Sequence, residues 1–451
     1  IRRPPISTLF PSTTLFRSEK QGNIKYDISW TTLGENLDYL ERKGVSPNIA
    51  SFVGATTIRI NKLGYENRPP DVHELDAMKN LVKQAMEEGA IGVSSSLIYA
   101  PASFADTREL IELCNVVSEY DGMYISHLRS EGDNLLEALD EFIHIAEQAD
   151  IRSELYHIKA AGQENWYKMD SAIQRINSAR AQGLPITADM YNYPAAGTGL
   201  YATMPQWVQE GGHDAWVERL KNPSVRKRVI QEMTARGDGW ENFYYMVGTP
   251  ENIILNGFIT DSLKHLTGKT VAEVAALRNV TPPEVILDLV VQDNSRVNAV
   301  YFLMTEENIK KQIAQPWVSF GSDEASQAPE GIFLKSNPHP RAYGNFSRLL
   351  GKYVREEKVI TLEEAIRRLT SLPAENMKIK DRGMLKDGFF ADIVIFDADS
   401  ITDHATFTKP HQYSTGVKDV FVNGVQVLKD GEHTGAFPGR VVRGPGYTGQ
   451  R

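Results

Sequence analysis

The stretch MYISHLRSEGDNLLEALDEFIHIAEQADIRSELYHI, residues 123–158, decides the fold class. It opens with a short apolar run, Met123–His127, and continues into a helical pattern, Asn134–Gln148, whose apolar residues keep to one face. A second strand-like run, Glu154–Ile158, follows this helix almost at once. A strand, a helix and a strand in this order, with short connections, are typical of a parallel βαβ unit.

The same alternation extends to both sides of this stretch. The candidate strands are Asn48–Val53, Ile91–Ser95, Met123–His127, Glu154–Ile158, Pro185–Met190 and Trp317–Gly321. Helical patterns at Asp71–Gly89, Thr107–Ser118 and Asp170–Ala181 lie between them. Because six strands separated by helices fit most of a (β/α)8 barrel better than an open sheet, we predict an α/β fold of the TIM-barrel type.

Residues from about 200 to 300 break this rhythm. They contain further helical patterns, among them Val271–Arg278 and Pro283–Gln292, without the intervening strands. Loops at the catalytic face of such barrels commonly grow into long additions. We therefore interpret this region as an insertion that follows a barrel strand.

The C-terminal part of the chain has the pattern of an antiparallel sheet. Ala391–Asp397 and Val417–Leu428 are rich in β-branched residues, and the pair Asn423-Gly424 predicts a two-residue hairpin turn. We therefore expect a barrel over residues 19–385 and a small β-sandwich portion with a tail over residues 386–451.

The first eighteen residues, IRRPPISTLFPSTTLFRS, differ from the rest of the chain. They are rich in Arg, Ser and Thr and contain no acidic residue, which is also the composition of a transit peptide. The stretch resembles translated sequencing-adapter sequence more closely, so we exclude residues 1–18 from the fold. We accordingly expect the barrel to be truncated at its N-terminus, and any signal peptide to lie in the missing part.

Composition excludes several classes of protein. The 451 residues exceed what one compact core normally fills, and 41% of them are hydrophobic, as in ordinary soluble proteins. A net charge of −9 offers no basic surface for nucleic acid, and no apolar run approaches the roughly 18 residues of a membrane span. The single cysteine, Cys114, excludes an internal disulfide framework. We expect a cytoplasmic protein without a nucleic-acid or membrane partner.

Polar residues end three of the predicted strands. His127, His157 and Asp323 each stand at the carboxyl end of a different strand, and in a parallel barrel these ends converge on one face. A lone histidine at a strand end is more often structural, but the convergence of two with an aspartate favours a metal site. Two imidazoles and one carboxylate suit a divalent ion such as zinc. Asp323 can also accept a proton from a metal-activated water.

Several longer stretches of the chain resemble one known family. They are SHLRSEG (126–132), YHIKAAG (156–162), TADMYNYPAAGT (187–198), SFGSDEA (319–325), HPRAYGNFSRLLGKYVRE (339–356), LTSLPAENMKIKDRGMLKDGFFADIVIFD (369–397) and HQYSTGVKDVFVNG (411–424). They are similar to the N-acyl-D-amino-acid deacylase (D-aminoacylase) family of the amidohydrolase superfamily. The likeness runs from about Trp30 to Pro445.

This resemblance implies a zinc-dependent barrel that hydrolyses the amide of a small N-acyl-D-amino acid to a carboxylate and a D-amino acid, with one or two Zn²⁺ ions. It implies that His127 and His157 are zinc ligands, and that Asp323 binds metal and moves the proton. Lys159 and Tyr191 look like the residues that hold the α-carboxylate of the substrate.

The sequence leaves two assignments open, the roles of Arg129 and Glu131 and the pocket for the substrate side chain. For Arg129 and Glu131, a salt-bridged loop at the strand end is at least as good an interpretation as direct catalysis. The pocket for the substrate side chain is expected to include residues of the insertion, such as Leu200, Tyr201 or Met204. The sequence does not decide between an apolar and an acidic substrate.

The chain departs from the family at its start. The family opens with a His-x-His motif on the first strand and a bridging Cys, and no two of the ten histidines here stand two apart. Cys114 falls within a predicted helix, where a buried structural thiol is the better interpretation. We therefore expect an incomplete zinc site, and a chain that is inactive or poorly stable although its longer parent is active.

Two alternatives to the deacylase remain. A dihydroorotase- or hydantoinase-like cyclic amidase shares the barrel, but its usual metal-bridging lysine has no counterpart in the strand at residues 91–96. A non-catalytic pseudoenzyme accounts for the missing ligands, but it leaves the retained His127, His157, Lys159 and Asp323 without a purpose.

Overall fold

The centre of the molecule is a parallel sheet. The computed structural model describes residues 28–237 and 239–449, so the adapter-like segment 1–18 lies outside the described residues. The sheet contains β1 (Val53–Gly54), β2 (Gly92–Ser96), β3 (Met123–His127), β4 (Arg152–Leu155), β5 (Ile186–Met190) and β9 (Val318–Phe320), in this spatial order. All of its neighbours pair in parallel, and each predicted strand overlaps one of these, which confirms the barrel-type α/β fold.

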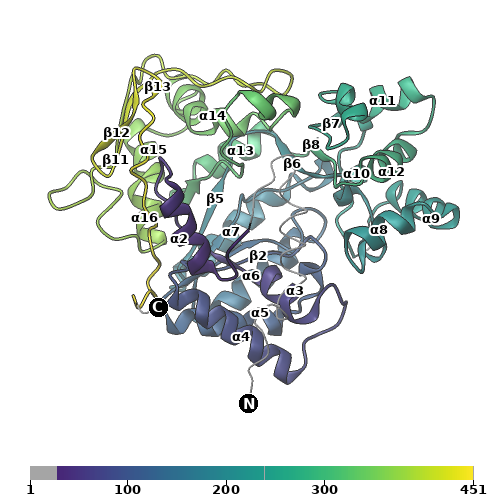
Figure 1. Cartoon of the computed structure of the whole chain (residues 1–451), viewed down its shortest axis with the longest axis horizontal. Helices are drawn as coiled ribbons and strands as arrows, with labels where there is room; N and C mark the ends of the chain where they lie inside the picture. The colour runs from purple at the N-terminus through teal and green to yellow at the C-terminus, as the bar shows by residue number, and fades with distance from the viewer. Residues whose placement is uncertain (1–27, 238, 450–451) are drawn as a thin grey trace.

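Helices connect these strands and cover the sheet (Figure 1). They are α3 (Ala55–Leu63), α4 (Val72–Glu87), α5 (Thr107–Glu119), α6 (Leu135–Gln148), α7 (Lys168–Ala181) and α13 (Glu306–Ile313). The start of α4 is fixed by a capping box, in which Asp71 accepts a hydrogen bond from the backbone of Glu74 and Glu74 caps Asp71 in return. The apolar face of each helix packs on the sheet, as the periodicity predicts.

The main core lies between these helices and the strands. Leu139, Phe142 and Ile145 of α6 are buried there, and the Phe142 ring stacks on Tyr124 of β3 with 5.7 Å between the ring centroids. Cys114 of α5 is a free thiol in the same core, and burial raises its pKa. The thiol is therefore structural, as expected from the sequence.

Residues 195–302 build a second body on one side of the barrel (right in Figure 1). An antiparallel sheet has the order β6 (Ala195–Gly199), β8 (Asn298–Phe302) and β7 (Ile253–Leu255). Its helices are α8 (His213–Leu220), α9 (Pro223–Met233), α10 (Phe243–Met246), α11 (Val271–Arg278) and α12 (Pro282–Asp293). Apolar side chains of these elements form a core of their own.

The C-terminal region returns to the start of the chain. After α14 (Arg341–Arg348), a π-helical segment (Leu349–Glu356), α15 (Leu362–Leu369) and α16 (Ser371–Asn376), an antiparallel sheet contains β10 (Ile393–Phe396), β11 (Val417–Val422), β12 (Val425–Lys429) and β13 (Glu432–His433). Asn423 and Gly424 both have positive φ, 50° and 81°, which confirms the predicted hairpin turn. The tail then contacts the N-terminal region, where Arg443 Nη2 lies 2.7 Å from Oδ1 of Asp38 in α2 (Leu33–Lys43).

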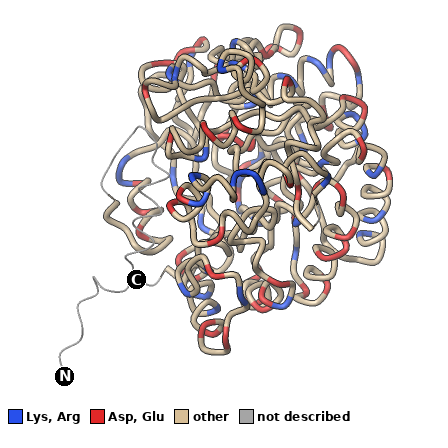
Figure 2. The backbone as a smooth tube through the Cα atoms, turned by 90° about the vertical axis from the view of Figure 1, so that its right-hand side faces the viewer, with Lys and Arg blue, Asp and Glu red and all other residues tan. Residues whose placement is uncertain are grey.

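Short 3-10 turns link several of these elements. They are Ala102–Phe104, Gln163–Asn165, Leu200–Thr203, Gln206–Gln209, Pro250–Asn252, Asp261–Leu266 and Gly331–Lys335. Acidic and basic residues are interspersed over the described part of the chain (Figure 2). Within the described ranges, no helix combines the length and the apolar character that crossing a membrane requires.

Candidate metal centre and substrate cavity

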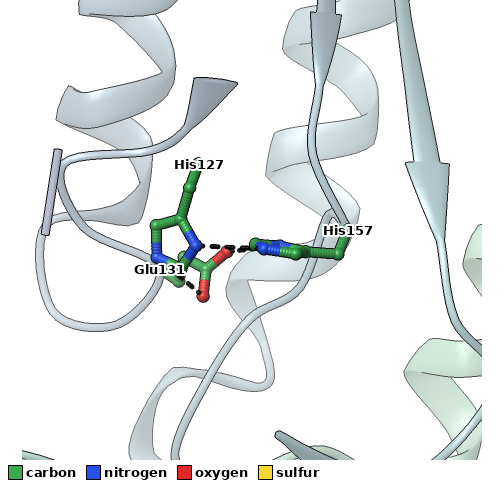
Figure 3. A group of neighbouring side chains, drawn as sticks. All are labelled: His127, Glu131 and His157. Atoms are coloured by element: carbon green, nitrogen blue, oxygen red, sulfur yellow. Dashed lines mark hydrogen bonds and ion pairs between the residues drawn. The ribbon is translucent and has the colours of Figure 1, made fainter. Parts of the chain in front are cut away.

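Two of the predicted ligands meet at the carboxyl ends of β3 and β4. His127 is the last residue of β3 and His157 lies two residues beyond β4, and their Nδ1 and Nε2 atoms are 3.0 Å apart. Glu131, in the loop after β3, joins them, with its Oε2 3.5 Å from His127 Nε2 and its Oε1 3.1 Å from His157 Nδ1 (Figure 3). One ligand atom from each residue lies within 4.8 Å of the others, so the three side chains can hold one metal ion.

Burial keeps both imidazoles neutral. His127 and His157 are 6% and 8% exposed, and desolvation lowers the pKa of each to about 3. For His157, the neighbouring Lys159 ammonium lowers the pKa further. The neutral ring is the form that binds a metal. His127 Nε2 is buried and makes no hydrogen bond, so the donor chemistry fits a divalent cation such as zinc.

Lys159 lies inside this cluster. Its Nζ is 2.7 Å from Glu131 Oε1 and 2.5 Å from His157 Nδ1, and the lysine is 5% exposed. Glu131 therefore balances a buried positive charge as well as facing two imidazoles. The sequence leaves a salt bridge and a catalytic role open for Glu131, and its contacts in the structure include an ion pair with Lys159 and an approach to both imidazoles.

Arg129 has a structural role. It forms an ion pair with Glu141 of α6 and donates hydrogen bonds to the carbonyls of Ser103 and Ala105. These contacts fix the loop after β3 against its neighbours. They agree with the interpretation of Arg129 as part of a salt-bridged loop.

Glu241, which sequence reasoning missed, holds the Glu131 loop from the side of the second body. Its Oε1 accepts hydrogen bonds from Ser130 Oγ (2.5 Å), Glu131 N (2.6 Å) and Gly132 N (2.5 Å). Burial, followed by the charge of Glu131, raises the pKa of Glu241 to about 7. No sequence motif marks this residue, because it lies about 110 positions away in the chain.

The His157 backbone is held in an unusual conformation. Its φ is +35°, outside the region that non-glycine residues normally adopt, and its N–H donates a 2.6 Å hydrogen bond to Asp189 Oδ1 of β5. Burial and the neighbouring Glu154 carboxylate raise the pKa of Asp189 well above its usual range. Strain of this kind persists where surrounding contacts fix it, and it is common at functional sites.

Asp323, predicted as both ligand and proton carrier, lies just after β9 with a φ of +49°. Its Oδ2 is 2.8 Å from Arg341 Nη2, and it is not among the three grouped ligands. Its charge nevertheless raises the pKa of His157, which places the carboxylate within electrostatic reach of the cluster. Asp323 is therefore on the same face as the two histidines but pairs with an arginine.

Arg341, which sequence reasoning also missed, lies in the family-like stretch 339–356. Its guanidinium is 3% exposed, and Nε and Nη1 are buried without a hydrogen-bond partner. It lies 4.3 Å above the ring of Tyr191, whose centroid is also 5.6 Å from Lys159 Nζ. Lys159 and Tyr191, the predicted carboxylate-binding pair, thus have a cationic neighbour, a buried arginine whose Nε and Nη1 donate no hydrogen bond.

A cavity of about 1090 Å³ opens between the barrel and the second body. Its lining includes Thr198, Tyr201, Arg296, Asp323, Glu324 and Arg341. The Tyr99 ring connects it to the metal cluster, since its centroid lies 5.3 Å from Tyr201 and 5.4 Å from His127. Tyr201 is therefore placed as expected for a side-chain pocket, whereas Leu200 and Met204 are buried in the core of the second body.

This geometry agrees with the comparison to known proteins. Residues 47–428 match the model of the amidohydrolase family. The chain belongs to this family. It is 31% identical to an N-acyl-D-aspartate deacylase of Alcaligenes xylosoxydans xylosoxydans over 92% of the chain and 72% of the relative. It is 29% identical to a D-aminoacylase of the same organism, over 97% of the chain and 78% of the relative.

This amidohydrolase is also similar to a solved N-acyl-D-amino-acid deacylase. The N-acyl-D-glutamate deacylase of Bordetella bronchiseptica, determined with zinc and a phosphonate inhibitor, superposes with a TM-score of 0.76 at 27% identity. The match covers 93% of this chain and 76% of the other. The resemblance to the N-acyl-D-amino-acid deacylase (D-aminoacylase) family is thereby confirmed.

Proposed function

We propose that this amidohydrolase catalyses the zinc-dependent hydrolysis of the amide bond of N-acyl-D-amino acids, releasing a carboxylate and a D-amino acid. The observation that supports it is the buried group of two neutral imidazoles and one carboxylate at the strand ends, beside a cavity with a partly unsatisfied arginine. The relatives named above act on N-acyl-D-amino acids and belong to the same family.

His127, Glu131 and His157 are the residues that would hold the ion. When bound, zinc supplies a Lewis acid that activates water and polarises the acyl carbonyl. Burial serves this chemistry, since desolvation keeps both imidazoles unprotonated and excludes bulk water from the cluster. Asp323 also remains a predicted metal ligand from the sequence resemblance.

Asp323 is the proposed proton carrier. Its carboxylate lies at the cavity wall, on the same face as the histidines, and can take a proton from the attacking water and return it to the departing amine. Arg341, 2.8 Å away, fixes the orientation of this carboxylate. Asp323 has a φ of +49°, which is uncommon for a non-glycine residue, and it lines the cavity.

The substrate α-carboxylate is proposed to bind at Tyr191, Lys159 and Arg341. The Tyr191 phenol is buried and its ring lies near both cations, and burial raises its pKa, so it stays a hydrogen-bond donor. The unused Nη1 of Arg341 offers a charged donor to the same anion. A fixed carboxylate orients the amide of one enantiomer toward the metal cluster.

The test is hydrolysis with a stereochemical readout. The 451-residue chain is loaded with zinc and incubated with N-acetyl-D-amino acids and their L-enantiomers, and released acetate is measured. Asp323→Asn, which keeps the volume but removes the proton acceptor, is the matched variant, and its rate is expected to fall by about 100-fold or more.

Acetate release from the D-compounds, lost in Asp323→Asn, supports the proposal and contradicts the expectation, drawn from the missing His-x-His motif, that this chain is inactive. Calorimetric binding of the same compounds provides a readout that does not need turnover. If the chain shows no hydrolysis and no preferential binding of the D-enantiomer, the assignment is overturned. Equal hydrolysis of both enantiomers would remove the stereochemical part of the assignment.

A further inference from the structure

Arg296 is a cationic group of the cavity that the reaction described above does not use. Its guanidinium lies 5.0 Å above the ring of Tyr201, and it makes no ion pair with any described residue. The Tyr201 hydroxyl is 3.2 Å from Thr198 Oγ1, so the platform under the guanidinium is itself held in place. Arg296 is exposed at the cavity wall, and a cation there without a countercharge is suited to an anionic ligand.

The acidic residues of the cavity do not neutralise Arg296. Asp323 and Glu324 both face Arg341, at 2.8 Å and 3.5 Å. Asp214, the third lining carboxylate, is not within ion-pair distance of Arg296 in the described part of the chain. The cavity therefore has one arginine beside the proton carrier and a second whose charge is left for a ligand.

Strand β6 sets the spacing of the two arginines. A Cβ placed on Gly197 would lie 3.4 Å from Arg341 Nη2, and one placed on Gly199 would lie 3.0 Å from Arg296 Cβ. Residues two apart on a strand face the same side, about 6.7 Å from each other. Both arginines therefore pack on one face of β6, where the two glycines let them approach the strand closely.

The backbone of Arg296 is fixed in a strained turn. Val297 is buried and has a φ of +45°, which is rare for a β-branched residue, and its N–H donates to Ser295 Oγ at 3.0 Å. The carbonyl of Arg296 accepts a 2.8 Å hydrogen bond from Leu200 N at the end of β6. A strained segment held by several contacts is typical of residues that contact a ligand.

We propose that Arg296 binds a carboxylate on the substrate side chain, so that the preferred substrates are N-acyl derivatives of acidic D-amino acids. This inference rests on the proposed function. The α-carboxylate lies at Arg341 and Tyr191, and the side-chain carboxylate, one or two methylenes further, reaches along β6 toward Arg296. Between the apolar and the acidic substrates that the sequence leaves open, this assignment favours the acidic class.

The experiment compares ligands that differ only in the side chain. Binding of N-acetyl-D-glutamate, N-acetyl-D-aspartate and N-acetyl-D-leucine to the zinc-loaded chain is measured by calorimetry, for the native protein and for Arg296→Gln and Arg296→Lys. Arg228→Gln is the matched control, because Arg228 also lies above an aromatic ring, 4.0 Å from Trp207, but outside the cavity.

The native protein is expected to bind at least one acidic compound more tightly than N-acetyl-D-leucine. Arg296→Gln should weaken that binding about 10-fold or more, the effect of losing one charged hydrogen bond, and leave N-acetyl-D-leucine unchanged. Arg296→Lys should recover part of the loss, and Arg228→Gln should behave as the native protein.

Two results overturn the proposal in different ways. If N-acetyl-D-leucine binds more tightly than both acidic compounds, or Arg296→Gln weakens all three equally, Arg296 does not select the side chain, although the deacylase function stands. If none of the three D-compounds binds, the proposed function fails and this inference fails with it.

Discussion

Replacing Glu131 with Gln separates its two roles, countercharge and metal ligand. In the metal-free protein, Glu131→Gln leaves the Lys159 ammonium, 5% exposed, without the carboxylate that lies 2.7 Å away. Breaking a buried ion pair from one side costs about 3–5 kcal/mol. Since Gln keeps an oxygen that can accept a hydrogen bond from Lys159, the free energy of unfolding should fall by about 3 kcal/mol, near the lower end of that range.

The second effect concerns zinc. At a free zinc concentration of 100 times its dissociation constant, the native protein gains about 2.7 kcal/mol of stability from binding. Glu131 is the only charged member of the three grouped ligands, and even outer partners of metal ligands are worth about 10- to 100-fold in affinity. If the dissociation constant rises by about 100-fold, the same zinc concentration stabilises Glu131→Gln by only about 0.4 kcal/mol.

The assay is urea unfolding with chelator and with a fixed excess of zinc. Glu109→Gln is the matched control, because Glu109 of α5 forms a similarly buried ion pair with Arg59 of α3, away from the metal cluster. Both variants should lose stability without metal, but only Glu131→Gln should lose the zinc response. A full zinc response in Glu131→Gln would show that the ion does not use this carboxylate, and the three-residue site would have to be abandoned.

Three further changes test the structure more broadly. Because burial raises the pKa of Glu241 from 4.5 to about 7, the folded metal-free protein holds more protons than the unfolded chain between these values, and its free energy of unfolding falls by up to about 3 kcal/mol as the pH rises through them. Glu241→Gln should remove this slope from urea midpoints measured at pH 4.5 to 8, and an unchanged slope would contradict the assignment. Gly92→Ala places a methyl group 1.8 Å from the Met123 carbonyl oxygen on the neighbouring strand. The free energy of unfolding of this variant should fall by about 3 kcal/mol or more, which a lower melting temperature would show. Phe142→Ala, in the main core, should cost about 3–5 kcal/mol in the same thermal assay, and a near-native melting temperature would show that its packing on Tyr124 is loose.

The sequence predicted the barrel well because its signals are local. Strand Met123–His127 and helix Val271–Arg278 were predicted with the bounds that the structure has. Strand β4 is displaced from its predicted range Glu154–Ile158, because Tyr156 and His157 already belong to the loop. The positive φ of His157 ends the strand, and only the contact of its backbone with Asp189 shows why.

The candidate site was predicted only where a residue type at a strand end carried the signal. The structure brings His127 and His157 together, and leaves Asp323 paired with Arg341 on the same face. For Glu131 the sequence leaves a salt bridge and direct catalysis both open, because its distance to both imidazoles depends on how the loop after β3 folds back. The unsatisfied donors of Arg341 become visible only when its neighbours are in place.

Glu241 shows why the rest of the site was beyond sequence reasoning, and what this means for the protein. One buried carboxylate oxygen accepts three hydrogen bonds from residues 130–132, and these are the residues that present Glu131 to the histidines. Backbone N–H groups left without such an acceptor would each cost about 1–3 kcal/mol, so the loop has its observed shape only when the second body is folded against the barrel. The same body contributes Arg296 and Tyr201 to the cavity. Metal binding and recognition of the substrate side chain therefore depend on one interface, and a change that loosens it should weaken both together.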